Sequence, residues 1–110
     1  MIDLVNTRTT YEDTYEVAYY DINLDSITIG QLDVMVEDDQ PAYVERIDID
    51  PEYQNKGYGT KVLYTLSNLY DGILVAPDNA DAQRLYERIG TLCNYEYADY
   101  IDQGYGVYEI

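Results

Sequence analysis

The 110 residues include 22 acidic side chains, only six Lys and Arg and no histidine, which gives a formal net charge of −16 at neutral pH. A field of this sign repels nucleic acid and anionic membranes, so neither is an expected partner. Without histidine, no transition-metal site is expected, and the commonest general base in enzymes is missing. Any chemistry must therefore use carboxylates, tyrosines, water or the backbone.

A single cysteine, Cys93, excludes an intramolecular disulfide and is expected to be a small buried residue rather than a nucleophile. The N-terminal residues show no basic stretch followed by an apolar one, and no apolar run reaches membrane length. We therefore expect one cytoplasmic domain over residues 1–110. The acidity fits a basic substrate or partner, adaptation for solubility or high salt, or mimicry of nucleic acid, and the composition leaves these alternatives open.

The predicted elements begin with strands. Residues 15–24 are rich in β-branched and aromatic side chains, which is typical of a strand. Across residues 27–36 the apolar positions change from odd to even numbers at Gly30-Gln31, which predicts a bulge or a bend within a second strand. Residues 38–41 predict a turn, and residues 42–50 a third strand that ends at a proline.

Helices and strands alternate in the second half of the chain. Residues 59–70 carry an apolar stripe at helical spacing and end at Asp71-Gly72. The wholly apolar residues 73–76 predict a strand buried on both faces. Pro77-Asp78-Asn79 caps a second helix that closes at Gly90. Two final strands are predicted over 91–97 and 105–110. The order βββαβαββ predicts an α+β fold, a mixed sheet with helices packed against it.

The connection from Ile47 to Thr60 carries the strongest signal of a binding site. A strand ends at Asp50-Pro51, and two glycines, Gly57 and Gly59, stand where the next helix begins. Backbone N–H groups at a helix N-terminus favour an anion such as a phosphate. The glycine spacing fits neither a Walker A loop nor a dinucleotide fingerprint. A tight turn without any ligand remains the alternative.

Two blocks of residues resemble one family. Gln54-x-x-Gly57-x-Gly59 is similar to the Gln/Arg-x-x-Gly-x-Gly/Ala signature of the GNAT superfamily of acyl-CoA-dependent N-acetyltransferases. The run Asn79-x-x-Ala82-x-x-Leu85-Tyr86-Glu87-x-x-Gly90 resembles that family's later helix. The resemblance covers about residues 42–110. It implies a single GNAT-like domain with a shortened N-terminal part and a mostly antiparallel mixed sheet with helices on its faces.

The resemblance also implies a site for acetyl-CoA as co-substrate, with no metal. Backbone groups of the third strand would contact the pantetheine arm, the loop amides would hold the pyrophosphate with charge from Lys56 or Lys61, and Asn79 would hydrogen-bond the pantetheine. The implied cofactor-binding residues are Ile47, Asp48, Ile49, Gln54, Asn55, Lys56, Gly57, Tyr58, Gly59, Thr60, Asn79 and Tyr86.

The implied catalytic residues are less sharply defined. Tyr86 would act as general acid toward the departing thiolate, although its place on an apolar stripe equally suits a core residue. Some family members carry a glutamate base where this chain has Leu74. Glu45 matches an acid that others carry one strand earlier, and is either the base or a surface bystander. Thr91 replaces the usual aromatic residue after the closing glycine.

The implied function is transfer of an acetyl group from acetyl-CoA to a primary amine. The acidic surface favours a cationic acceptor, either a small molecule or a protein lysine or N-terminus. Between Leu24 and Ile27 there is room only for a turn, where family members often insert helices, so the acceptor side would be open or completed by a second copy in a homodimer. The alternative is a non-catalytic acidic decoy on a GNAT-like scaffold that occludes a basic partner.

Overall fold

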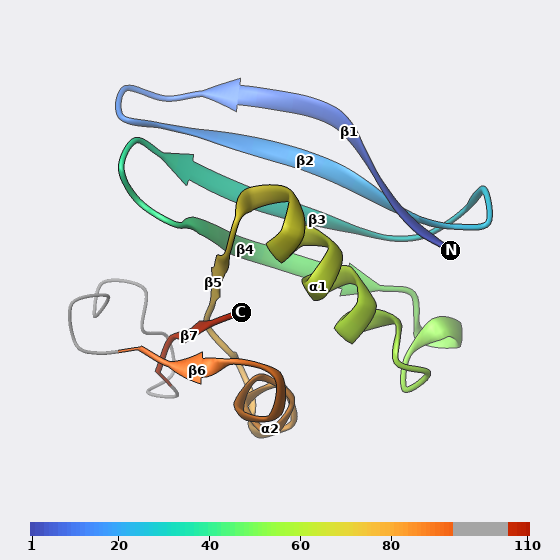
Figure 1. The fold of residues 1–110 in the computed structure, drawn as a ribbon. Coiled ribbons are helices and arrows are strands. Elements are labelled where there is room, and N and C mark those ends of the chain that lie inside the picture. Colours follow the sequence, from blue (N-terminus) through green and yellow to red (C-terminus); the bar gives the residue numbers. More distant parts are fainter. Residues whose placement is uncertain (94–105) are drawn as a thin grey trace.

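A computed structural model describes residues 1–93 and 106–110 (Figure 1). Its single sheet has seven strands in the order β1-β2-β3-β4-β5-β7-β6. β4 and β5 are parallel, and every other neighbouring pair is antiparallel. The strands are β1 (Ile2–Tyr11), β2 (Tyr15–Leu24), β3 (Ile27–Glu37), β4 (Ala42–Ile49), β5 (Ile73–Val75), β6 (Thr91–Leu92) and β7 (Tyr108–Glu109).

Two α-helices and one short 3-10 helix complete the described fold. They are η1 (Pro51–Tyr53), α1 (Tyr58–Tyr70) and α2 (Ala80–Ile89). In Figure 1, α1 crosses in front of the sheet, and α2 lies at its lower end beside β6. Within the described ranges, neither helix is long and apolar enough to cross a membrane.

The predicted α+β fold is confirmed, with one strand that the sequence did not predict. β1 pairs with β2 along its length and forms one edge of the sheet. Most of its side chains are exposed, and the run from Asn6 to Thr10 is polar on both faces. An edge strand with little apolar surface to bury lacks the alternation by which strands are detected.

The irregularity predicted in β3 is present. Ile22 pairs with Gly30 and Asn23 pairs with Thr28, so Ile29 is an extra residue on β3. The bulge brings both Ile29 and Leu32 into the core, where each is fully buried. Of the predicted final strands, only Thr91–Leu92 and Tyr108–Glu109 are assigned, and residues 94–105 lie outside the described part of the chain.

The core fills the space between α1 and the sheet. α1 contributes Val62, Leu63 and Leu66, which pack with apolar side chains of β2 to β5. Burial of each such side chain contributes about 1.5–3 kcal/mol. Two polar contacts fix the helix at its far end: the hydroxyls of Tyr20 and Tyr70 are 2.7 Å apart, and Ser67 Oγ donates to the carbonyl of Ile110. α1 is therefore a rigid support for the loop that precedes it.

Candidate functional site

β4 and β5 part after a short parallel stretch. Their pairing runs from Ala42 opposite Ile73 to Val44 opposite Val75, whereas β4 continues to Ile49. The parting begins at Glu45, which is an extra residue because Asp33 pairs with Arg46 and Val34 with Val44. In the described ranges no strand pairs with this side of β4 beyond Val44. Its backbone groups are therefore open to an extended ligand that carries amides.

The loop between β4 and α1 is held by contacts of its own. The Asp50 N–H donates to the carbonyl of Ile29, and Gln54 Nε2 donates to the carbonyl of Ile49 over 2.7 Å. The rings of Tyr53 and Tyr58 pack across the loop, with centroids 6.4 Å apart. The side chain of Gln54 thus has a structural role in this state, because it ties the loop to the end of the strand.

Backbone donors are concentrated where this loop becomes a helix. In residues 1–93 and 106–110, none of the N–H groups from Asn55 to Thr60 donates to a backbone or side-chain acceptor. The first backbone bond of α1 is from the Lys61 N–H to the carbonyl of Gly57. Unpaired N–H groups at a helix N-terminus, together with the helix dipole, form a site for an anion.

The two loop glycines serve different purposes. Gly57 has a φ of 84°, a left-handed conformation that side chains rarely adopt. Gly59 lies within the first turn of α1, and a Cβ there would meet only Ile49 Cδ1 at an ordinary 3.8 Å. Glycine inside a helix costs up to about 1 kcal/mol relative to alanine. Since packing within the chain does not require Gly59, its small size leaves room for a group from outside.

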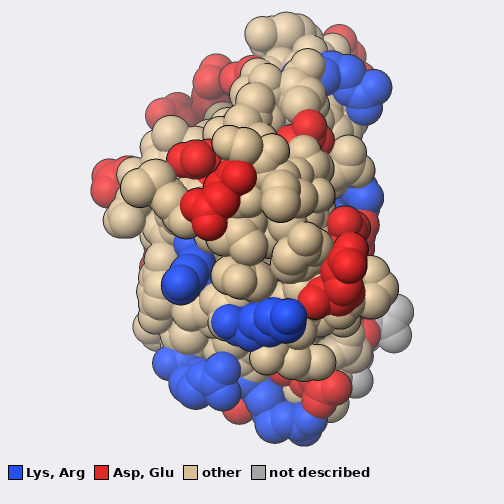
Figure 2. Space-filling model, turned by 90° about the vertical axis from the view of Figure 1, so that its right-hand side faces the viewer, with Lys and Arg blue, Asp and Glu red and all other residues tan. Residues whose placement is uncertain are grey.

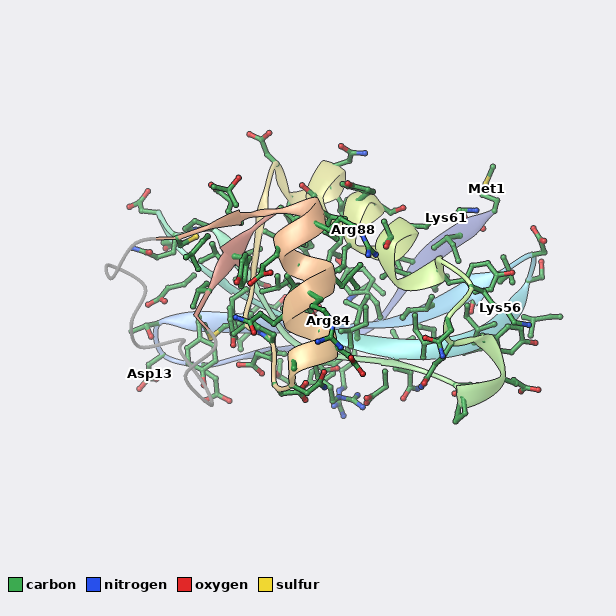
Figure 3. The ribbon with its side chains drawn as sticks, turned by 90° about the horizontal axis from the view of Figure 1, so that it is seen from below. Met1, Asp13, Lys56, Lys61, Arg84 and Arg88 are labelled. Atoms are coloured by element: carbon green, nitrogen blue, oxygen red, sulfur yellow. The ribbon has the colours of Figure 1, made fainter. Side chains whose placement is uncertain are left out.

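Positive side chains gather on the face of the molecule that carries this loop. Figure 2 shows Lys and Arg side chains gathered in the lower half of this face. In Figure 3, Lys56 projects from the loop and Lys61 from α1. Arg84 and Arg88 project from the facing side of α2. Among described residues, Lys56, Lys61 and Arg88 form no ion pair, and Arg84 pairs only with Asp81. Sequence reasoning missed both arginines; their i, i+4 spacing was the available signal.

The arginine on β4 lies in a different environment. Arg46 Nε lies 3.1 Å from Asp33 Oδ2, and Nη1 lies 2.6 Å from Asp48 Oδ2. The hydrogen bonds to these carboxylates raise the pKa of Arg46. Arg8 lies over the ring of Tyr19, 4.0 Å from its centroid. These two arginines border an open hollow of about 350 Å³ over β1 to β4. The residues lining it are Thr7, Arg8, Tyr19, Tyr20, Asp21, Gln31, Asp33 and Arg46.

Asn79 is the N-cap of α2, as the sequence predicted. Its side-chain oxygen accepts from the N–H of Ala82 at 2.8 Å, and its Nδ2 donates to Asp78 at 2.8 Å. The cap uses the side-chain carbonyl, and one N–H of the amide remains for another acceptor. A contact from Asn79 to a pantetheine therefore stays a prediction, limited to that N–H.

Tyr86 is buried, with 7% of its surface exposed. Its ring packs against Tyr108, with centroids 6.4 Å apart. Burial, followed by the charge of Asp78 and then by Tyr43, raises the pKa of the Tyr86 hydroxyl to about 12. The hydroxyl thus keeps its proton throughout the physiological range and can act as a donor. Asp78 and Tyr43, which sequence reasoning missed, come from the turn before α2 and from β4.

The remaining predicted residues are divided between core and surface. Leu74, at the position where some family members carry a glutamate, is fully buried. Glu45 is exposed at the bulge where the strands part, and no described hydrogen bond joins it to Tyr86. Ile47 and Ile49 are half-buried beside the core, while Asp48 is exposed. In the described ranges, no group of three His, Cys, Asp or Glu could hold a metal ion.

The chain resembles known acetyltransferases in sequence and in fold. The acetyltransferase (GNAT) domain matches residues 12–90, and no curated protein matches the chain. Similar structures include PaiA N-acetyltransferase from Thermoplasma acidophilum in complex with coenzyme A, with a TM-score of 0.63 at 16% identity over 84% of this chain and 59% of that one.

Two further structures share the fold. A GNAT-family protein from Bacteroides thetaiotaomicron gives a TM-score of 0.60 at 26% identity, over 84% of this chain and 59% of that one. A GNAT-family acetyltransferase from Elizabethkingia anophelis with acetyl-CoA bound gives 0.61 at 13% identity, over 86% of this chain and 75% of that one. The chain spans about three-fifths of the length of the first two.

Proposed function

The chain belongs to the GNAT acetyltransferase family, and on that premise we propose that it transfers an acetyl group from acetyl-CoA to a primary amine. One observation carries the proposal: unpaired N–H groups from Asn55 to Thr60 lie at the open edge of β4, beside cations without carboxylate partners. A chain with 22 acidic residues could neutralise Lys56, Lys61 and Arg88 internally. Leaving them unpaired around free N–H groups favours an anionic ligand.

The donor would lie along the parted strands. Amides of its pantetheine arm would pair with the backbone of Ile47 and Ile49 on the stretch of β4 that β5 leaves unpaired, because the intervening Asp48 directs its backbone toward β3. Its pyrophosphate would accept hydrogen bonds from the amides of Asn55 to Thr60, where the absence of a side chain on Gly59 would allow a close approach. When bound, acetyl-CoA supplies an activated thioester carbonyl.

The residues of this chain would then position the reaction and move protons. An amine held beside the thioester would attack its carbonyl carbon, N–H groups near Ile49 would stabilise the negative charge on the oxygen, and the carbon–sulfur bond would break to release a thiolate. The amine nitrogen loses a proton to Glu45, directly or through water. Tyr86 donates to the departing sulfur. Because its pKa of about 12 exceeds that of an ordinary thiol, near 8.5, it stabilises the thiolate chiefly through a hydrogen bond.

The acceptor is proposed to be cationic and to approach from an open side. The turns after β1 and β2 are short, and Asp25 and Ser26, both at positive φ, form the second of them. Beside the end of β4, the carboxylate of Asp48 is 66% exposed. These features suit a polyamine, a protein lysine or an N-terminus, either on one chain or with a second copy that completes the acceptor side.

The test is direct. Acetyl-CoA should bind the purified chain in calorimetry, and thiol release should be detected with one or more members of a panel of polyamines, aminoglycosides and lysine peptides. Binding without turnover on any amine would contradict the enzymatic proposal. No binding at all would favour a non-catalytic acidic decoy, for which affinity toward basic proteins is the next measurement.

A further inference from the structure

The function proposed above assigns no specific contact with acetyl-CoA to the two arginines of α2. Arg84 and Arg88 have i, i+4 spacing, so they lie on one side of the helix. Figure 3 shows both projecting toward the side where Lys56 and Lys61 lie. They come from an element far along the chain from the loop, yet they extend its positive region in a molecule with a net charge of −16.

Contacts within the chain explain little of this arrangement. The ion pair of Arg84 with Asp81 joins side chains that are 68% and 88% exposed, and exposed pairs contribute little to stability. Arg88 forms no ion pair with a carboxylate in residues 1–93 or 106–110. The helix dipole favours a cation in the last turn, which accounts for Arg88 but neither for Arg84 nor for their common direction.

The proposed acetyl donor also carries its negative charge in two separate groups, as the protein carries its cations on the loop and on α2. Coenzyme A carries a pyrophosphate and, one sugar away, a 3′-phosphate. The loop already supplies N–H groups, Lys56 and Lys61 for the first anion. We propose that Arg84 and Arg88 bind the 3′-phosphate, so that the site selects donors that carry it; this rests on the acetyl-CoA site proposed above. A guanidinium suits the task because its planar donors match phosphate oxygens in pairs.

The experiment compares coenzyme A with 3′-dephospho-coenzyme A by calorimetry on the whole chain. Wild type is expected to bind coenzyme A about 10-fold more tightly, the scale of two partly exposed charged contacts. Arg84→Gln/Arg88→Gln should lose that preference while its affinity for the dephospho form changes less than about twofold. Both side chains are exposed, so the variant should keep the wild-type melting temperature.

Two controls separate a local contact from a general change of charge. Arg8→Gln removes one positive charge beside Tyr19, away from the loop, and should keep the full preference for the 3′-phosphate. Lys56→Gln/Lys61→Gln should weaken both ligands by the same factor, because both contain the pyrophosphate.

The outcomes distinguish the two proposals. Equal wild-type affinity for both ligands, or a preference that survives in Arg84→Gln/Arg88→Gln, would overturn the role of the arginines and leave the acetyl-CoA site standing. Failure of wild type to bind either ligand would overturn the acetyl-CoA site and this inference with it.

Discussion

The first turn of α2 is satisfied from within the chain, whereas the first turn of α1 is not. At α2, the Asn79 side chain accepts from Ala82 and Asp81 provides an acidic group in the first turn. At α1, the N-cap is Gly57, no side chain caps the helix, and its first turn contains no acidic residue. In a chain so rich in acids, this difference is consistent with the anion site proposed at the α1 terminus.

The strands that precede the two helices also differ in whether their edges are paired. α2 follows soon after β5, the strand that ends where β4 and β5 part. α1 follows the part of β4 that pairs with β3 but no longer with β5. The open helix end and the open strand edge are therefore adjacent in sequence, joined through Gln54. This difference can be tested in three ways: a side chain can be placed over the N-terminus of α1, the charged and proton-donating groups of the proposed site can be removed, or the cap of α2 can be removed.

Closing the α1 terminus should have the largest effect. Gly59→Leu puts a side chain into the space beside the free N–H groups, so acetyl-CoA binding should weaken by more than about 1,000-fold, or over about 4 kcal/mol. Stability should not fall, because leucine is a better helix former than glycine and the Cβ meets only Ile49 at 3.8 Å. Calorimetry measures the first effect and urea unfolding the second.

Asn68→Leu, on an exposed face of α1 near its other end, is the control and should bind normally. Retained acetyl-CoA binding by Gly59→Leu would place the donor elsewhere.

Tyr86→Phe should have the next largest effect, in turnover and not in binding. The ring and its packing on Tyr108 remain, but the donor to the departing sulfur is lost, so kcat should fall about 100-fold with little change in affinity for acetyl-CoA. Tyr108→Phe removes a neighbouring hydroxyl, which donates to Glu87 at 3.3 Å, and should leave kcat within a few fold. Normal turnover by Tyr86→Phe would identify Tyr86 as a core residue only.

The pH profile of the wild type adds an independent check on Tyr86. A phenol is neutral and able to donate below its pKa, so ionisation of Tyr86 should not reduce kcat until the pH approaches about 12. Because the pKa of Tyr86 is higher in the folded than in the unfolded chain, burying its neutral hydroxyl adds to the free energy of unfolding at any pH below the unfolded pKa of about 10. That contribution is lost as the pH rises toward about 12. A loss of kcat near pH 8 that Tyr86→Phe abolishes would contradict this assignment.

The sequence predicted the local features of the site. Gly57, Gly59 and the Asn79 cap each depend on neighbours in the chain, so their spacing was sufficient to predict the loop and both helices. The grouping of Arg84 and Arg88 with Lys56 and Lys61 was not predicted, because it depends on where α2 lies relative to α1. The proximity of Tyr43 to Tyr86 was missed because it depends on where α2 lies relative to β4.

The part of the fold that the sequence did not predict is the strand at the edge of the sheet. The strand β1 pairs on one side only and exposes most of its residues, so the polar run from Asn6 to Thr10 showed no alternation. The bulge in β3 was predicted, since a change of phase in apolar residues is visible in the sequence. The parting of β4 and β5 followed from no pattern in the residues themselves, because it depends on where β5 ends relative to β4.

Removing the cations around α1 should have a smaller, salt-dependent effect. Lys56→Gln/Lys61→Gln should weaken acetyl-CoA binding about 10-fold at low ionic strength and less at high, because exposed charges are screened. Arg8→Gln, with a charge removed from the other side of the sheet, should change the affinity less than about twofold. Equal loss at all salt concentrations would mean that these lysines do not act through charge.

Opening the α2 terminus should have the smallest effect. Asn79→Ala removes the acceptor of the Ala82 N–H and should lower the free energy of unfolding by about 1 kcal/mol, whereas Asn79→Gly, which makes α2 begin as α1 does, should cost only a few tenths. Urea unfolding measures both. Asn79→Gly should gain no second site for coenzyme A in calorimetry, because Asp81 still opposes an anion there. A second site would mean that an uncapped helix end alone suffices, and that the cations and parted strands around α1 are not required.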